Sequence, residues 1–192
     1  MCIRDRNLLE NNASVSYTAW KRSSDIVLSS TSKTGSLTVF TGPGTKAFFE
    51  DIRYAMNQVS KMYPDKAEPT EVLWIRYKYA DLSWAENMAK EKLSAADYNQ
   101  IARNQGGNLA SSNCDTNSAN CRGAYQQTGP SGIALIMQGV ENSGPAEPAR
   151  MSTGMLEAHE YFHALQRIPI MNRNVEVWPH AWWREGSAEW AQ

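Results

Sequence analysis

The sequence contains little histidine and little cysteine, with three residues of each among 192. It also lacks a strong charge of either sign, because 19 lysines and arginines nearly balance 20 aspartates and glutamates and leave a net charge of −1. This balance gives no electrostatic reason to expect a nucleic-acid partner, whose phosphates attract clustered cations. Long hydrophobic runs are missing as well, since stretches such as residues 133–137 fall far short of the roughly 20 apolar residues that span a bilayer. We therefore expect no nucleic-acid binding and no transmembrane segment.

With 42% hydrophobic and 20% charged residues, the chain has the composition of one globular domain. Its first residues, Met1–Arg6, are what the DNA string ATG TGT ATA AGA GAC AGN encodes, and that string resembles a transposase adapter of sequencing libraries. We expect residues 1–6 to be an artefact of this kind and leave them out of the fold prediction. The chain stops at Gln192, inside a stretch that is predicted to be helical. We therefore expect one domain over residues 7–192, truncated at its C-terminus.

Two of the cysteines, Cys114 and Cys121, flank the short polar stretch 115–120. A disulfide that closes so short a loop stabilises a fold by roughly 2 kcal/mol, and it persists only in an oxidising compartment. The alternative is a pair of free thiols in a cytosolic protein. We favour the disulfide and, with it, a secreted or periplasmic location.

The hydrophobic pattern predicts a mixture of strands and helices. Within residues 7–44, apolar residues at alternate positions predict short strands around Val15 and Tyr17, Ile26 and Leu28, and Leu37 and Val39. The other predicted elements are a helix over 46–62, a strand over 71–79, helices over 81–93 and 94–106, a polar loop over 107–131 and a strand over 132–140. Thr45, Asp81 and Ser94 stand where side chains commonly cap helices. This order of elements predicts an α+β fold.

The most informative stretch is residues 159–163, with the sequence His-Glu-Tyr-Phe-His. In a helix, His159 and His163 lie one turn apart on the same face, so both imidazoles can reach one metal ion. Glu160 stands beside them and can act on a water molecule at that metal. A second stretch, residues 183–190, offers the carboxylate of Glu185 as a third ligand from a following helix that is predicted to begin near residue 180 or 181.

These two motifs together resemble those of the gluzincins, a group of zinc metallopeptidases that includes the thermolysin and aminopeptidase N families. The second gluzincin motif often has the sequence Asn-Glu-Gly-x-Ala, and this chain has Arg184 in place of the asparagine. The resemblance covers residues 152–192. It implies a zincin-like N-terminal lobe, with a small mixed sheet and active-site helices, and a helical C-terminal lobe that is missing here. It further implies a Zn²⁺ ion held by His159, His163 and Glu185, with Glu160 as the general base.

The resemblance also implies roles for residues around this centre. An acidic residue one turn after the third ligand often accepts a hydrogen bond from a ligand histidine, which gives Glu189 that role. The remaining histidine, His180, could be a fourth ligand or an oxyanion donor, but independently of the resemblance we expect it in the surface turn before the second helix. In gluzincins, the edge strand before the active-site helix pairs with an extended substrate. By position this strand includes Ile133, Ala134 and Leu135, and the alternative is that it lies in the interior of the sheet.

The function expected from this resemblance is hydrolysis of a peptide or protein substrate by a zinc-activated water. The tyrosine or histidine that stabilises the transition state in gluzincins is expected further downstream than this chain extends. One alternative is a catalytically inactive, zinc-stabilised binding or surface module of the same fold. The intact Glu160 argues against it, because structural zinc has no need of a base. Another alternative is a non-peptide substrate at the same site, since fold and metal do not fix the substrate.

Overall fold

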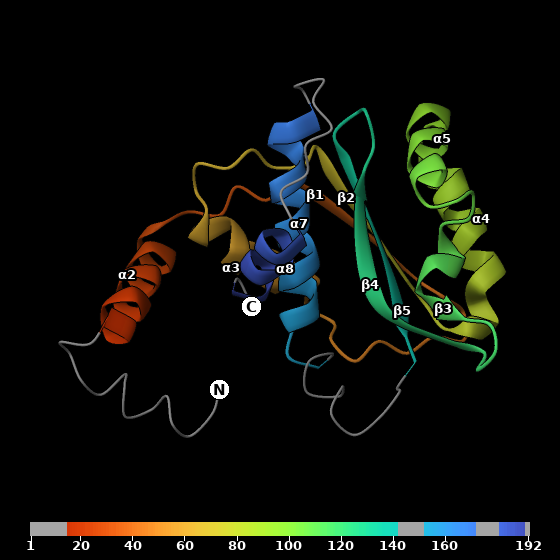
Figure 1. Ribbon diagram of the computed structural model, residues 1–192, viewed down its shortest axis with the longest axis horizontal. Helices are drawn as coiled ribbons and strands as arrows, with labels where there is room; N and C mark the ends of the chain where they lie inside the picture. The colour runs from red at the N-terminus through yellow and green to blue at the C-terminus, as the bar shows by residue number, and fades with distance from the viewer. Residues whose placement is uncertain (1–14, 142–151, 172–180, 191–192) are drawn as a thin grey trace.

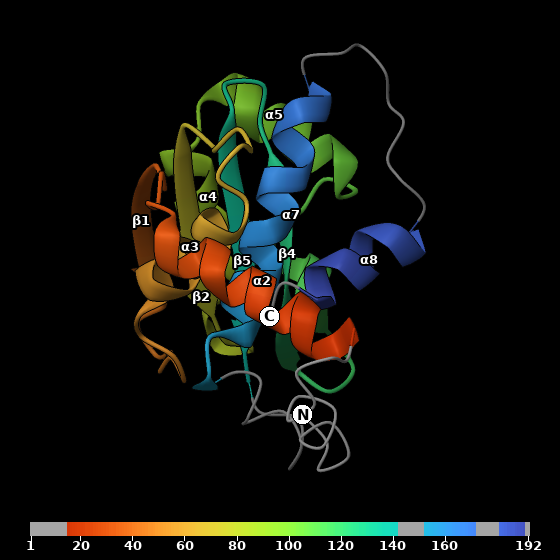
Figure 2. The same ribbon diagram turned by 90° about the vertical axis from the view of Figure 1, so that its left-hand side faces the viewer.

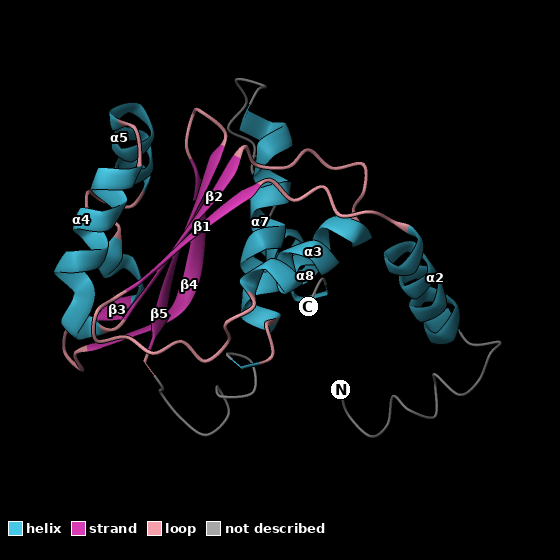
Figure 3. Cartoon of the chain, turned by 180° about the vertical axis from the view of Figure 1, so that it is seen from behind, coloured by secondary structure: helices cyan, strands magenta, loops and turns pink. Residues whose placement is uncertain are grey.

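The computed structural model of the chain describes residues 15–141, 152–171 and 181–190. In this part of the chain, one five-stranded sheet separates two layers of helices (Figure 1). One face of the sheet is covered by α4 (Leu82–Lys92) and α5 (Ala95–Asn104), and the other by α3 (Ile52–Met62) and α7 (Met155–Met171). Figure 3 shows the same two layers from behind. The expected α+β class is therefore confirmed.

The sheet is mixed, and its strand order differs from the order along the chain. The strands are β1 (Ser36–Thr41), β2 (Glu71–Tyr77), β3 (Cys114–Asp115), β4 (Asn120–Thr128) and β5 (Ile133–Val140). They lie side by side in the order β1-β2-β5-β4-β3. Strands β1, β2 and β5 run parallel to one another, whereas β4 runs antiparallel to β5, and β3 runs antiparallel to β4. The last strand in the sequence, β5, thus lies in the middle of the sheet.

The central strands β2 and β5 are almost continuously apolar because helices cover both of their faces. Alternate side chains enter two different cores. Trp74 and Ile136 belong to the core beneath α7, together with Tyr161 and Phe162. The neighbouring positions of β2 and β5 belong to the core beneath α4 and α5. The helix that carries the histidine motif therefore rests on one of the two hydrophobic cores.

The remaining helices are α2 (Val15–Ser29) and α8 (Ala181–Trp190), with short 3₁₀ turns over Tyr79–Asp81 and Ala110–Asn113. Helix α2 packs against α3, and α8 packs against α7 (Figure 2). None of the helices in the described ranges has the length and apolar character that a membrane crossing requires.

Most of the elements predicted beyond residue 36 are confirmed, including three strands and three helices. Ser94 caps α5 as expected, since its hydroxyl accepts a hydrogen bond from the backbone N–H of Asp97 at 3.1 Å. Helix α3 begins six residues later than predicted, at Ile52, and Asp51 rather than Thr45 caps it. The Asp81 side chain instead accepts hydrogen bonds from Gly44 and Thr45, so it fixes the loop after β1.

Two predictions from local pattern were wrong. The stretch with Val15, Tyr17, Ile26 and Leu28 forms helix α2 rather than two strands. The alternation does not mark the buried face of a strand here, because Val15 and Leu28 are both exposed on the helix. The polar stretch 107–131, predicted as a loop, contains β4. Its polar residues Gln126 and Thr128 are buried because β4 forms a hairpin with β5 through the short turn at residues 129–132.

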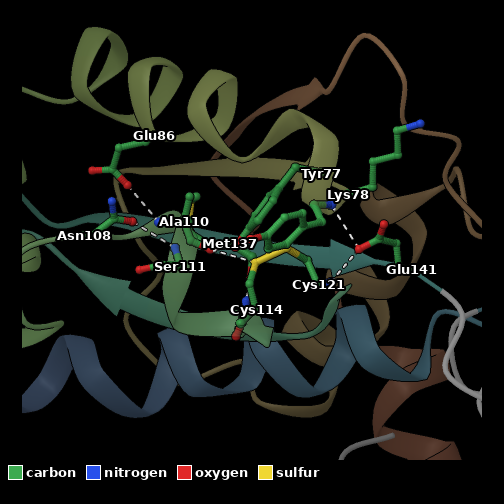
Figure 4. Close-up of a disulfide and its surroundings, with 12 residues drawn as sticks. Tyr77, Lys78, Glu86, Asn108, Ala110, Ser111, Cys114, Cys121, Met137 and Glu141 are labelled. Atoms are coloured by element: carbon green, nitrogen blue, oxygen red, sulfur yellow. Dashed lines mark hydrogen bonds between the residues drawn. A yellow bond between two sulfur atoms is a disulfide. The ribbon is translucent and has the colours of Figure 1, made fainter. Parts of the chain in front are cut away.

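The predicted disulfide between Cys114 and Cys121 is present and joins β3 to β4 at directly opposed positions. Figure 4 shows it beside Tyr77 and Glu141. The Tyr77 hydroxyl donates to the Ala110 carbonyl oxygen at 2.7 Å. The Glu141 carboxylate accepts from the backbone N–H of Cys121 at 2.5 Å. The disulfide therefore fastens the short strand β3 to a part of the sheet that is already anchored.

Replacing both cysteines with serine should lower the free energy of unfolding by roughly 2 kcal/mol, because the unfolded chain regains the entropy of an open loop. Urea unfolding followed by circular dichroism measures the difference. The internal control is a reducing agent, which should destabilise the wild type and leave the C114S/C121S variant unchanged. Equal unfolding curves for the oxidised wild type and the C114S/C121S variant would contradict a stabilising role of the disulfide.

Candidate metal centre

Helix α7 presents the histidine motif while its other face is held in the core. Ala158, Tyr161, Phe162 and Leu165 recur at helical spacing and pack against the sheet and α3. Just before the helix, Gly154 adopts a φ of +82°, a backbone conformation that favours glycine, and its carbonyl accepts from the Ala158 N–H at 2.9 Å. The packed face thus fixes the direction in which the motif points.

The three side chains predicted as metal ligands converge on one point. The Nε2 atoms of His159 and His163 are 3.0 Å apart. The Oε2 atom of Glu185 lies 3.5 Å from the first of these nitrogens and 3.3 Å from the second. Ligand atoms around a tetrahedral zinc ion, each roughly 2.0–2.1 Å from the metal, are about 3.4 Å from one another. The triangle formed by His159, His163 and Glu185 therefore has the size that such an ion requires.

Helix α8 brings Glu185 to the histidines by packing on α7. Ala188 is fully buried in the core beneath α7, where a larger side chain would separate the helices. Gly186, by contrast, is exposed, and a Cβ atom there would meet no other atom within 4 Å. In the stretch Glu185-Gly186-Ser187-Ala188, the alanine is therefore the residue that the packing demands.

Arg184, which stands where the gluzincin motif often has asparagine, holds the carboxylate of Glu185. Its Nε donates to Oε1 of Glu185 at 2.8 Å, which leaves Oε2 directed at the two imidazoles. Burial opposes ionisation of Glu185, but the hydrogen bond from Arg184 and the neighbouring His163 outweigh it, so the pKa of this carboxyl is lowered. Glu185 is thus an anion at neutral pH, as a metal ligand must be.

Gln166 contacts the centre and was not among the predicted residues. Its Oε1 lies 2.8 Å from Nδ1 of His163. Its Nε2 lies 2.8 Å from the hydroxyl of Ser187 and 3.2 Å from the carbonyl oxygen of Arg184. The sequence does carry a signal for it, because a residue three positions after His163 lies on the same helix face.

Glu160, the predicted base, is buried, and it follows His159 directly in the sequence of α7. The side chain of Glu189, predicted to support a ligand histidine, lies outside the described residues, as does His180. No contact of either is therefore part of the site as described.

The predicted substrate strand does not lie at an edge. β5, with Ile133, Ala134 and Leu135, is paired with β2 on one side and with β4 on the other. Because strands pair with it on both sides, β5 offers no free backbone edge to a substrate, and its side chains are buried. Within the described ranges, the free edge on this side belongs to β4 over residues 122–128, because β3 pairs only with Asn120 and Cys121. The prediction failed because β4 was taken for a loop.

Polar contacts also fix α7 on its buried side. Gln138 donates from Nε2 to Oε1 of Glu157 at 2.9 Å and accepts at Oε1 from Trp74 Nε1 at 2.8 Å. On another side of the helix, the Tyr161 hydroxyl donates to Glu68. These bonds link the helix to the central strands and to the loop before β2, so the motif cannot rotate without breaking them.

Comparison of the chain with protein-family models, with curated proteins and with solved structures finds no match. The interpretation of the site consequently rests on its geometry and on the residues themselves. Among the described residues, His159, His163 and Glu185 form the one cluster of three potential metal ligands.

The pH dependence of stability should reveal the buried carboxyl of Glu157. Burial raises its pKa, although the bond from Gln138 and the charge of Arg76 oppose the shift. Above the ordinary glutamate pKa of about 4.3, the unfolded state ionises more readily than the folded state, so this group destabilises the fold. Glu157→Gln removes that effect and can still accept from Gln138.

We expect the unfolding free energy of E157Q to exceed that of the wild type increasingly as pH rises from about 4 to 7. Urea unfolding at several pH values provides the measurement. Glu91→Gln on α4, where the side chain is exposed, is the matched control and should show no such trend. A difference that stays constant over this pH range would contradict the assignment.

Proposed function

We propose that this protein is a zinc-dependent hydrolase of the gluzincin type with a zincin-like lobe, and that it cleaves peptide bonds. The observation that carries the proposal is the convergence of His159, His163 and Glu185 at the spacing of a tetrahedral zinc site. Two imidazoles and one carboxylate are a catalytic rather than a structural ligand set, because they leave one position open.

The chemical composition of the site also favours a bound cation. Three groups that can donate an electron pair lie within 3.5 Å of one another, which is unfavourable unless a proton or a cation lies among them, and one cation can serve all three at once. Zinc bound there would polarise a carbonyl group and lower the pKa of water towards 7. Glu160 would serve as the general base that accepts a proton from the attacking water and passes it to the leaving amine.

Glu160 distinguishes an enzyme from a zinc-stabilised binding module. It is buried on α7 directly after His159, which is the position that a general base occupies in the His-Glu-x-x-His motif. A structural zinc needs no adjacent base, so a binding module has no use for this residue. The buried Glu160 is therefore better explained by catalysis.

The free edge of β4 supports a peptide substrate over a non-peptide one. Helix α7 packs against β4, so this edge runs close to the helix that bears the motif (Figure 1). An extended peptide can add to such an edge by backbone hydrogen bonding. We propose residues 122–128 as the substrate strand in place of residues 133–135. The disulfide is compatible with a secreted or periplasmic peptidase, which is the location we propose.

Loss of a ligand should weaken zinc binding while leaving the fold intact. We expect wild-type protein to bind one zinc ion, and Glu185→Ala to lose more affinity than the roughly 10- to 100-fold caused by loss of an outer partner. Competition with a chromophoric chelator measures the affinity, and the exposed Glu91→Gln is the control. A wild type that takes up no zinc when it is supplied would refute the metal site.

Replacing Glu160 with glutamine should separate binding from catalysis. The amide cannot accept a proton, so hydrolysis of a quenched peptide should fall by about 10²- to 10⁴-fold. Zinc affinity should stay near the wild-type value because Glu160 is not a ligand. Full turnover by E160Q, or turnover by the wild type that survives chelation, would contradict the mechanism.

A further inference from the structure

Gln166 connects the second metal ligand with the helix that bears the third. It lies on α7 one turn after His163, and its amide reaches both His163 and α8. The contacts to α8 are made to the carbonyl oxygen of Arg184 and to the hydroxyl of Ser187, on either side of Glu185. A single side chain therefore contacts both parts of the proposed metal centre.

The contacts on α8 fix the orientation of the amide. A backbone carbonyl can only accept, so the group of Gln166 that faces Arg184 must be the NH₂. The Ser187 hydroxyl itself donates to the Arg184 carbonyl at 3.2 Å, so its oxygen is available to accept from the same NH₂. Both N–H groups of the amide are thereby used, and the reverse orientation would set two oxygens against each other.

The orientation of the amide fixes the tautomer of His163. With the NH₂ of Gln166 directed at α8, its Oε1 faces Nδ1 of His163 at 2.8 Å and can only accept. The imidazole must therefore carry its proton on Nδ1. Its Nε2, which lies 3.3 Å from Oε2 of Glu185, then presents a lone pair to the metal position.

We propose that Gln166 is a positioning residue that holds His163 in the metal-binding tautomer and couples this state to the docking of α8. The role of Gln166 in zinc binding rests on the proposed hydrolase function, but the tautomer of His163 can be measured without metal. The coupling means that His163 and Glu185 become available as ligands together. Loss of the glutamine side chain should loosen both.

The first test is a measurement of the His163 tautomer in zinc-free protein. Long-range ¹H–¹⁵N correlation spectra at pH 8 distinguish a protonated Nδ1 from a protonated Nε2, and a His163→Asn variant assigns the signals. We expect Nδ1–H in the wild type and a mixture of tautomers in Gln166→Leu. Nε2–H in the wild type, or an unchanged tautomer in Q166L, would overturn the proposal.

The second test compares two substitutions that differ in what they retain. Gln166→Leu loses every bond of the amide, whereas Gln166→Glu can still accept from Nδ1 of His163 but no longer donates to Arg184. We expect Q166L to bind zinc about 10- to 100-fold more weakly, and Q166E to bind it more tightly than Q166L. Gln100→Leu, on an exposed position of α5, should match the wild type.

A purely structural link between the helices predicts a different result. In that case Q166E and Q166L would lose zinc affinity equally, because both lose the donor to α8, and the proposal would be wrong. Thermal unfolding of each variant shows whether it is folded, and Q166E is informative even if Q166L is not. If the wild type binds no zinc, the hydrolase proposal fails, while the tautomer spectra still decide the role of Gln166.

Discussion

The contact between α7 and α8 is the interaction on which the site depends. His159 and His163 come from one helix, and their spacing alone brings them together. Glu185 comes from a separate helix and reaches them only because the small, buried Ala188 lets α8 approach the core beneath α7. Arg184 then turns one carboxylate oxygen inwards by holding the other. The triangle of His159, His163 and Glu185 therefore results from helix packing rather than from the histidine motif alone.

Helix α7 also contains several buried polar side chains. Glu157, His159, Glu160 and His163 are all buried on α7. Such groups destabilise a fold unless they are paired, and several of the pairs reach distant parts of the chain, as the bond from Gln138 to Glu157 shows. The arrangement stabilises one orientation of the helix over others. Rigidity of this kind is what a site with a defined open position requires.

The residues of the centre were predictable to the extent that their signals are local. The histidine spacing predicts that two imidazoles lie together, and the second motif predicts Glu185 beside them, because each signal is encoded within one helix turn. Helices α3, α4 and α5 were predictable for the same reason. The orientation of the Gln166 amide was not, since it is decided by a backbone carbonyl on α8. No periodicity in residues near 166 contains that information.

The sheet shows the same limit. β4 has a polar sequence that contains a glycine, so local sequence criteria predict a loop there. In the structure this residue, Gly123, has a φ of +78°. It becomes a strand because β5 pairs with it, and Gly139 of β5 permits the approach: a Cβ atom there would lie 2.5 Å from the backbone of Arg122. The edge of the sheet could therefore be placed only once the strand order was known, and the prediction for residues 133–135 failed with it.

The short strand β3 has a consequence for the length of any chain that adds to β4. Pinned by the disulfide, it occupies the positions opposite Asn120 and Cys121. An incoming extended segment must turn aside or terminate where β3 begins, because two chains cannot share one set of backbone groups. The disulfide thus limits the free edge of β4 at one end, so any extended segment that paired with this strand would be confined to residues 122–128.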